Sequence, residues 1–149
     1  MDNWRTIWRE GLAPSLSTTG LLALHDALLN DDQRIIQGAT TSPPPLRTVR
    51  HWPIEASCAI GFCAWQGEGL DTTGEVEDFF TQTCREAEAR MGQKAACRWF
   101  LNWFDDTPRE KMRRELRSEV LRVLHQRGTV VEQQPKRVRK EKVSQPAAV

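Results

Sequence analysis

The chain has 149 residues, of which 39% are hydrophobic and 28% are charged, a balance typical of one globular domain rather than a disordered chain. No run approaches the roughly 18 apolar residues that a membrane span needs, and the first residues lack the pattern of a secretory signal, so we expect a soluble, cytoplasmic protein with no membrane partner. The net formal charge is only +1, which disfavours a dedicated nucleic-acid-binding domain.

Two helices are predicted at the N-terminal end. Apolar residues recur at helical spacing over residues 2–12, with Trp4 and Trp8 one turn apart on the same stripe. The first interpretation packs these two indoles on the protein's own core, and the alternative docks them in a groove of a partner. Hydroxyl side chains at residues 17–19 then offer caps for a second helix over residues 21–30.

The middle of the chain contains a proline-rich loop and the predicted central helix. Residues 33–37 predict one or two helical turns, or a strand with no obvious partner. The three prolines at 43–45 favour an extended, stiff connector over a ligand for a proline-binding module. Pro53 suits the first position of a helix, and the almost unbroken apolar run after it predicts a helix over about 53–66 that is buried on all sides. Gly67 and Gly69 are expected to end this helix.

Three further helices are predicted. One of the threonines at 72–73 caps the fourth helix, which Gly92 ends. A fifth helix follows over residues 93–104. Residues 107–110 read Thr-Pro-Arg-Glu, a capping box with proline at the first helical position, and they begin a last helix that runs to about Arg127.

Together these elements predict an all-α fold, an irregular bundle of five to six helices around the buried central helix. Residues 1–127 form the predicted helical domain. Residues 128–149 show no periodic pattern and carry five lysines or arginines against two glutamates. This segment is predicted to be a disordered basic tail.

No residue pattern predicts a catalytic, cofactor-binding or metal-binding site. The cysteines lack the spacing of zinc ligands and lie among apolar residues, so we interpret them as buried free thiols rather than disulfides. These cysteines are Cys58, Cys63, Cys84 and Cys97. The three histidines share no local motif with a cysteine or a carboxylate. We therefore expect a protein that is not an enzyme and uses no cofactor.

The last predicted helix has the most distinctive surface, because it is rich in arginine. Most of its charges can form pairs along the helix, at the i,i+3 and i,i+4 spacings. The assigned pairs are Glu110–Arg114, Lys111–Glu115 and Glu119–Arg122. This assignment leaves Arg113, Arg117 and Arg127 without partners.

The leading hypothesis is a small, non-enzymatic helical binding or adaptor protein that acts through contacts with another protein. It follows from a well-formed helical pattern in the absence of any catalytic motif. The candidate partner-binding residues are Trp4, Trp8, Arg113 and Arg117. The pattern gives neither the partner nor the oligomeric state.

Two other classes of function stay open. The alternative is a nucleic-acid-associated accessory protein whose last helix and tail contact phosphates, with a strong dependence on salt. Its candidate contacts are Arg113, Arg117, Arg127, Lys136, Arg137, Arg139, Lys140 and Lys142. The third class is an enzyme whose site assembles in space from distant residues. Its candidates are His25, His51, Glu55 and the four cysteines.

Overall fold

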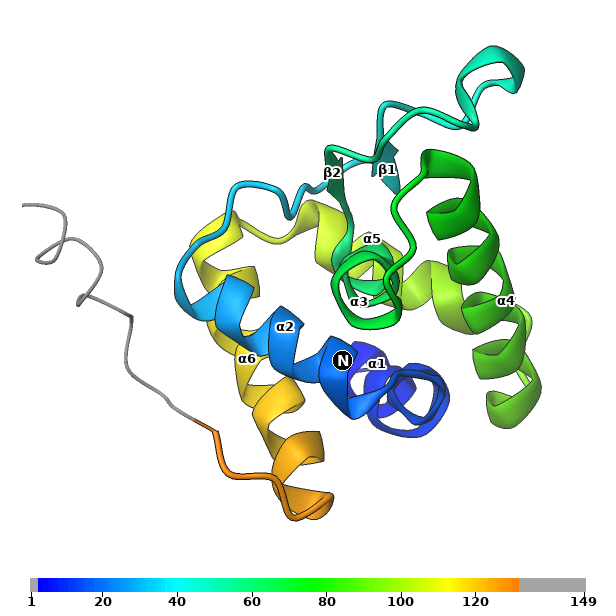
Figure 1. Ribbon diagram of the computed structural model, residues 1–149. Helices are drawn as coiled ribbons and strands as arrows, with labels where there is room; N and C mark the ends of the chain where they lie inside the picture. Colours follow the sequence, from blue (N-terminus) through cyan, green and yellow to red (C-terminus); the bar gives the residue numbers. More distant parts are fainter. Residues whose placement is uncertain (1–2, 132–149) are drawn as a thin grey trace, which may run out of the picture.

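The computed structural model describes residues 3–131 as helices joined by short loops and one longer connection (Figure 1). In chain order the elements are α1 (Asn3–Thr6), η1 (Ile7–Leu12), η2 (Ala13–Ser15), α2 (Thr18–Leu29), β1 (Thr41–Ser42), η3 (Arg47–Val49), β2 (Ala56–Ser57), α3 (Ala59–Glu68), α4 (Thr73–Met91), α5 (Ala96–Asp106) and α6 (Arg109–Gln126). This composition confirms the predicted all-α bundle. The two short strands pair antiparallel, with Thr41 opposite Ser57.

Helix α3 lies at the centre of the bundle. It packs against α2 on one side and α4 on the other, and Figure 1 shows it between these two helices. Helix α2 also packs on α6, while η1 contacts α4 and α5. The first six residues of α3, 59–64, are all buried, so the prediction of a central buried helix is confirmed for this part of the chain.

The predicted start of the central helix at Pro53 is wrong, because α3 begins six residues later. Cys58 is the N-cap, and its sulfur accepts a hydrogen bond from the Gly61 amide. The backbone groups of the residues before Cys58 form hydrogen bonds with segments that are distant in sequence. The Ile54 amide donates to Asp71, and the Ser57 amide donates to the carbonyl of residue 34. A helix over these residues would forfeit both long-range contacts.

Of the two glycines predicted to end this helix, Gly67 is wrong, because it lies inside α3 and faces Gly20 of α2. A Cβ atom at Gly67 would lie only 2.3 Å from the Gly20 Cα. The two glycines therefore let the backbones of α2 and α3 approach more closely than any other residue would allow. The other predicted stop, Gly69, is confirmed, because its left-handed backbone (φ 77°) forms the C-cap of α3.

The N-terminal helical segment packs on the core through its two tryptophans. Trp4 stacks on Trp103, with ring centroids 3.5 Å apart, and Trp8 stacks on Phe100 at 5.7 Å. Both indoles are buried, Trp8 completely. The first interpretation of this stripe, packing on the protein's own core, is therefore confirmed. Stacked aromatic pairs of this kind add about 1 kcal/mol beyond the area that they bury.

Two local predictions near the contact between residues 33–37 and the start of α6 need correction. Residues 33–37 form no helix; the strand alternative is nearer, and its partner is Ser57 of β2, with which Ile35 makes an isolated parallel bridge. The capping box is absent as well, because Pro108 occupies the N-cap position and no side chain caps the helix. The Thr107 carbonyl accepts a hydrogen bond of 2.7 Å from the Gln37 side chain. This contact ties the residue before α6 to the 33–37 segment, but it satisfies none of the N–H groups of the first turn.

At its other end α6 stops at Gln126, close to the predicted end of the domain. Gly128 follows with a left-handed backbone (φ 77°). Of the predicted tail, 128–149, residues 132–149 lie outside the described part of the chain. The division into a domain and a basic tail therefore stays a prediction.

Cys84 of α4 and Cys97 of α5 form a disulfide, whereas Cys58 and Cys63 are buried free thiols. The interpretation of all four cysteines as free thiols is therefore wrong for the first pair. The chain reverses at Gly92 and brings these two helices together, so residues 13 positions apart have Cα atoms 5.5 Å apart. Sequence spacing alone does not reveal this proximity.

Removal of the disulfide is expected to lower the free energy of unfolding by about 2 kcal/mol, because the cross-link restricts the unfolded chain. The variant Cys84→Ala/Cys97→Ala tests this in urea, with and without reductant. Reductant should lower the wild-type value and leave the variant unchanged, and thiol titration of the denatured wild type should find only Cys58 and Cys63. Equal sensitivity of both proteins to reductant would contradict the assignment.

Candidate functional site

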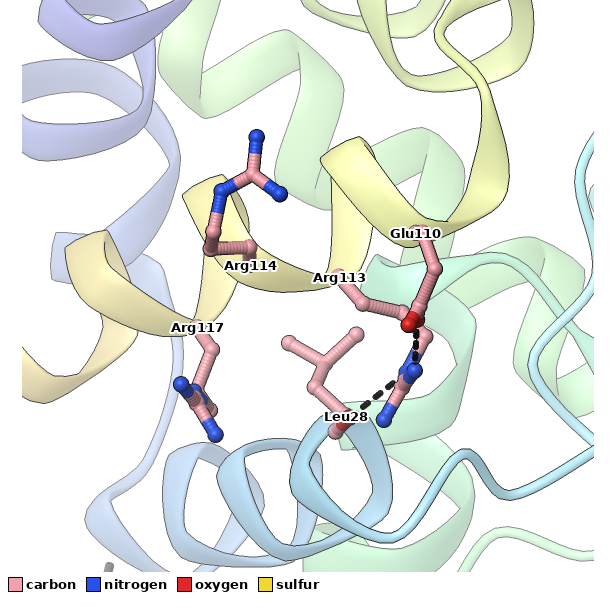
Figure 2. Close-up of a pocket in the computed structure, with 5 residues that line it drawn as sticks. All are labelled: Leu28, Glu110, Arg113, Arg114 and Arg117. Atoms are coloured by element: carbon pink, nitrogen blue, oxygen red, sulfur yellow. Dashed lines mark hydrogen bonds and ion pairs between the residues drawn. The ribbon is translucent and has the colours of Figure 1, made fainter.

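A cleft of about 220 Å³ separates the C-terminal part of α2 from the first turns of α6. Its lining residues are Leu28, Glu110, Arg113, Arg114 and Arg117 (Figure 2). The buried stripe of α6 includes Met112 and Leu116. Arg113 and Arg117 each follow one of these residues in sequence, and this phase of the helix puts both arginines beside α2. Figure 2 shows them on either side of Leu28.

Arg113 is fully engaged by the fold. Its guanidinium donates to the carbonyls of Leu28 at 2.8 Å and Leu29 at 3.1 Å, which belong to the last turn of α2. It also pairs with Glu110 and lies 3.5 Å from Asp31. Carbonyls at a helix C-terminus lack intrahelical donors and attract cations. Arg113 therefore acts as a tertiary cap for α2 and forms one fixed wall of the cleft.

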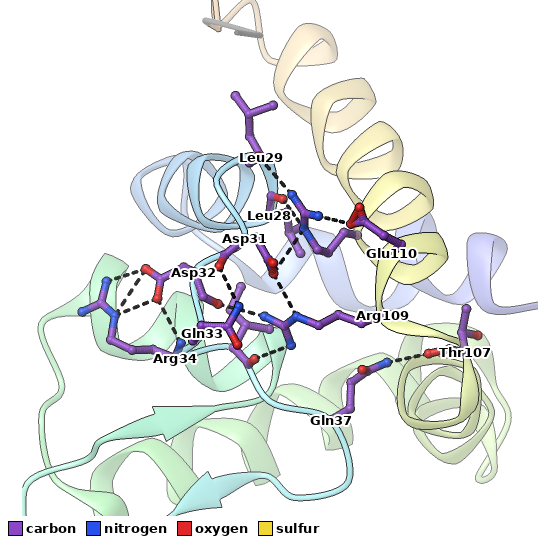
Figure 3. Close-up of polar contacts among 12 residues, drawn as sticks. Leu28, Leu29, Asp31, Asp32, Gln33, Arg34, Gln37, Thr107, Arg109 and Glu110 are labelled. Carbon is purple, nitrogen blue, oxygen red and sulfur yellow. Dashed lines mark hydrogen bonds and ion pairs between the residues drawn. The ribbon is translucent and has the colours of Figure 1, made fainter. Parts of the chain in front are cut away.

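Arg109 fixes the turn that follows α2 (Figure 3). Its guanidinium contacts the Asp31 carboxylate at 2.9 Å and the carbonyls of Asp32 and Ile35 at 3.0 and 2.8 Å. Asp31 adopts a left-handed backbone (φ 53°), which is uncommon for a residue with a side chain. This contact explains how the turn keeps that conformation, and it anchors the start of α6 to the same turn.

Arg114 and Arg117 differ from these two arginines. Arg114 is exposed and Arg117 is partly exposed. Within residues 3–131, neither side chain has a hydrogen bond or an ion pair. A guanidinium stays charged at any physiological pH, so the cleft carries two positive charges that the described protein does not neutralise.

The buried His25 of α2 lies within the electrostatic influence of Arg117. Burial and then the Arg117 charge lower the pKa of its imidazole below the usual 6.5. His25 is therefore neutral at pH 7 and adds no charge to the cleft. Its Nε2 atom is buried with no hydrogen-bond partner among the described residues, an exception to the pairing that buried polar atoms usually show.

The structure separates the candidate partner-binding residues. Trp4 and Trp8 are buried in the core, so neither indole is available as an anchor, and this part of the hypothesis is wrong. Arg113 lies at the cleft, but its guanidinium already donates hydrogen bonds to carbonyls at the C-terminus of α2. Arg117 is the one residue of the predicted set that keeps a charge open to a partner.

The fold likewise engages two of the three arginines of the last helix that were candidates for nucleic-acid contacts. Arg127 donates to the Thr18 hydroxyl and to the Ala13 carbonyl, both at 3.1 Å, so it joins the end of α6 to the start of α2. With Arg113 also engaged, Arg117 remains from the predicted contacts of the last helix. The predicted contacts in the tail lie outside the described residues. They are Lys136, Arg137, Arg139, Lys140 and Lys142.

None of the three charge pairs predicted along the last helix forms: Glu110 pairs with Arg113 on the same helix, whereas Glu115 and Glu119 have tertiary partners. Glu119 is buried, and three hydrogen bonds of 2.6 to 2.8 Å reach it from Arg5 and Arg9. Burial favours its neutral form, but the hydrogen bonds from Arg9 and Arg5 hold the pKa of its carboxyl below the usual value. Glu115 also lies 3.7 Å from Arg5.

Sequence reasoning missed Arg114, because Glu110 stood at the right spacing to neutralise it. In the structure Glu110 pairs with Arg113 instead. It also missed Trp52, whose side chain is 54% exposed. The signal available for Trp52 was its place in a loop between the proline run and Pro53, where the chain has no helical periodicity to bury an indole.

The residues considered for an assembled catalytic site are distributed between the surface and the core. His51 and Glu55 are exposed, whereas Cys58 is buried, and burial raises the pKa of its thiol to about 12. Burial also raises the pKa of the Cys63 thiol. Residues 3–131 contain no cluster of three histidine, cysteine or acidic side chains suited to a metal ion.

No family model, curated protein or solved structure matches the chain. None of the described helices has both the length and the apolar character needed to cross a bilayer. The functional argument therefore depends on the geometry of the α2–α6 cleft.

Proposed function

We propose that the chain is a non-enzymatic helical binding protein, and that the α2–α6 cleft receives an acidic segment of another protein. One observation carries this proposal. Four arginines lie at or beside the cleft, and the fold uses Arg109 and Arg113 but leaves Arg114 and Arg117 without acidic partners in residues 3–131.

The chemistry of the cleft supports an acidic ligand. A guanidinium presents a planar fork of donors that matches a carboxylate in bidentate geometry. Arg117 emerges from the middle of α6 and faces α2, so its backbone is held by tertiary packing. A rigid support of this kind reduces the entropy lost when a ligand binds.

The size of the cleft supports a peptide segment rather than a folded face. A volume of about 220 Å³ is below the range typical of pockets for drug-sized ligands. It accommodates one or two side chains of an extended or helical segment. Because the two arginines are near the surface, affinity is expected to fall as salt increases.

The test measures binding of a fluorescein-labelled peptide of glutamate and leucine residues by fluorescence anisotropy. The variant Arg114→Glu/Arg117→Glu is expected to weaken binding at least about tenfold, which corresponds to about 1.4 kcal/mol. The matched control is Lys111→Glu/Arg122→Glu, which makes the same change of net charge at two exposed positions of α6 and should retain most of the affinity.

Two results would overturn this proposal. One is an equal loss of affinity in the control variant, because the peptide would then follow net charge and not the cleft. The other is a wild-type protein that does not bind the acidic peptide even at low salt.

The nucleic-acid alternative stays a proposal with less support than before, because the fold engages Arg113 and Arg127. A single-stranded oligonucleotide tests it in the same assay. Binding that falls steeply with salt and disappears when residues 129–149 are removed would favour the alternative. A cytoplasmic location is likewise a proposal, and the Cys84–Cys97 disulfide weighs against it because the reducing cytosol rarely preserves such bonds.

A further inference from the structure

The connection between β1 and β2 projects from the helical body (Figure 1) and exposes two large apolar side chains. Leu46 is 64% exposed and Trp52 is 54% exposed. Each of the other five tryptophans is less exposed than Trp52. Exposure of this kind requires an explanation, because burying an indole stabilises a protein substantially.

Hydrogen bonds to the start of α4 hold the loop in place. The Thr73 amide donates to the Trp52 carbonyl and the Gly74 amide to the Arg50 carbonyl, both at 3.0 Å. The Thr73 hydroxyl donates to the Val49 carbonyl at 2.8 Å. The two amide bonds satisfy backbone N–H groups that a helix N-terminus leaves without partners. The backbone that carries Trp52 is thus ordered before any partner arrives.

The turns within the loop explain why Leu46 and Trp52 do not pack inward. The Val49 amide donates to the Leu46 carbonyl at 2.9 Å, and the Trp52 amide donates to the Val49 carbonyl at 3.0 Å. Val49, midway between them, is buried. Val49 therefore occupies the inward-facing position of the loop, and the larger side chains of Leu46 and Trp52 stay at the surface on either side of Val49.

Acidic side chains surround the base of this loop. Glu55 is its last residue, Asp71 lies on the segment that pairs with residues 52–54, and Glu75 lies in the first turn of α4. All three are exposed, and none has an ion pair within residues 3–131. The Arg50 guanidinium is neutralised by Asp78 at 2.8 Å. The base of the loop, next to the segment that carries Trp52, thus has three carboxylates without an ion pair among the described residues.

We infer that this loop, residues 46–55, is a docking surface that inserts Trp52 and Leu46 into an apolar pocket of a partner protein whose rim carries lysine or arginine. Tryptophan is the residue most typical of binding hot spots. The carboxylates of Glu55, Asp71 and Glu75 complement a basic rim and select against acidic surfaces. This surface is separate from the α2–α6 cleft, which selects the opposite charge.

The test uses a fluorescein-labelled amphipathic peptide of leucine and lysine residues as the probe. The wild type is expected to bind it, and Trp52→Ala is expected to weaken binding about tenfold or more. Trp99→Ala is the matched control, because Trp99 is 41% exposed on α5, and it should bind like the wild type. The charge variant Glu55→Lys/Glu75→Lys should weaken binding and reverse its dependence on salt.

Three measurements keep the result distinct from a folding defect and from the proposed function. The thermal midpoint of Trp52→Ala should match that of the wild type, because the indole is exposed. The Arg114→Glu/Arg117→Glu variant should bind the leucine–lysine peptide normally. A probe that binds Trp52→Ala as well as the wild type would overturn the inference. A second outcome would also overturn it: light scattering shows that the wild type self-associates and Trp52→Ala does not, while neither protein binds the peptide. The occupant would then be a second copy of the chain.

Discussion

The Gly67→Ala variant is expected to lose about 3 kcal/mol of its free energy of unfolding, an effect at the upper end for overpacking. The new Cβ would lie 2.3 Å from the Cα and 2.6 Å from the amide nitrogen of Gly20. These are backbone atoms in the middle of the contact between α2 and α3, so no side chain can rotate away to make room. The two helices must separate, and the packing around the central helix is lost with them.

Urea unfolding measures this effect, with Gln66→Ala as the matched control at an exposed neighbouring position of α3. The control is expected to change stability by less than about 0.5 kcal/mol. The sign of the Gly67→Ala effect is decisive. Alanine favours a helix over glycine by about 0.5–1 kcal/mol, so a stabilised variant would mean that the two helices are not in contact at Gly67.

The Glu119→Ala variant is also expected to lose about 3 kcal/mol. Removal of one partner of a buried ion pair costs 3–5 kcal/mol when the other charge stays buried. The lower figure applies here because the side chains of Arg5 and Arg9 are 27% and 38% exposed and regain water. Glu115→Ala is the control, since Glu115 makes only a 3.7 Å contact with Arg5, and it should cost less than about 1 kcal/mol.

The cost of Glu119→Ala should depend on pH. The pKa of Glu119 in the folded state lies below its ordinary value of 4.5, so the folded protein binds the carboxyl proton less tightly than the unfolded chain does. The stabilisation is therefore complete above pH 4.5 and is lost as the pH falls through the folded-state pKa. Unfolding curves of wild type and variant should converge at acid pH. A difference that grows on acidification would contradict the ion-pair assignment.

The helices that were predicted well are those whose burial follows a local period. In α2 and α4 the apolar stripe, the hydroxyl caps at Ser17 and Thr72 and the glycine at the end of α4 agree with the structure. The start of α3 was wrong because Pro53 has the right local chemistry for a helix start. Its neighbours pair instead with segments that are far away in sequence, and no local pattern reports this pairing.

The candidate site was predictable only in part for a related reason. Arg113 and Arg127 were left without partners because sequence pairing considers acidic side chains, whereas the acceptors in the structure are largely backbone carbonyls of distant elements. Glu119 was assigned to a neighbour on its own helix because its burial depends on the N-terminal segment. Arg117 was identified correctly as lacking a local partner, and the structure retains it at the cleft.

The pairing of Glu119 with Arg5 and Arg9 has a consequence for biosynthesis. These residues are separated by 114 and 110 positions along the chain. The N-terminal segment leaves the ribosome long before its buried counter-charge is translated, and chain elongation proceeds at about 5–20 residues per second. The arginines must therefore stay hydrated for several seconds at least, and closure of the bundle waits until α6 has emerged from the exit tunnel.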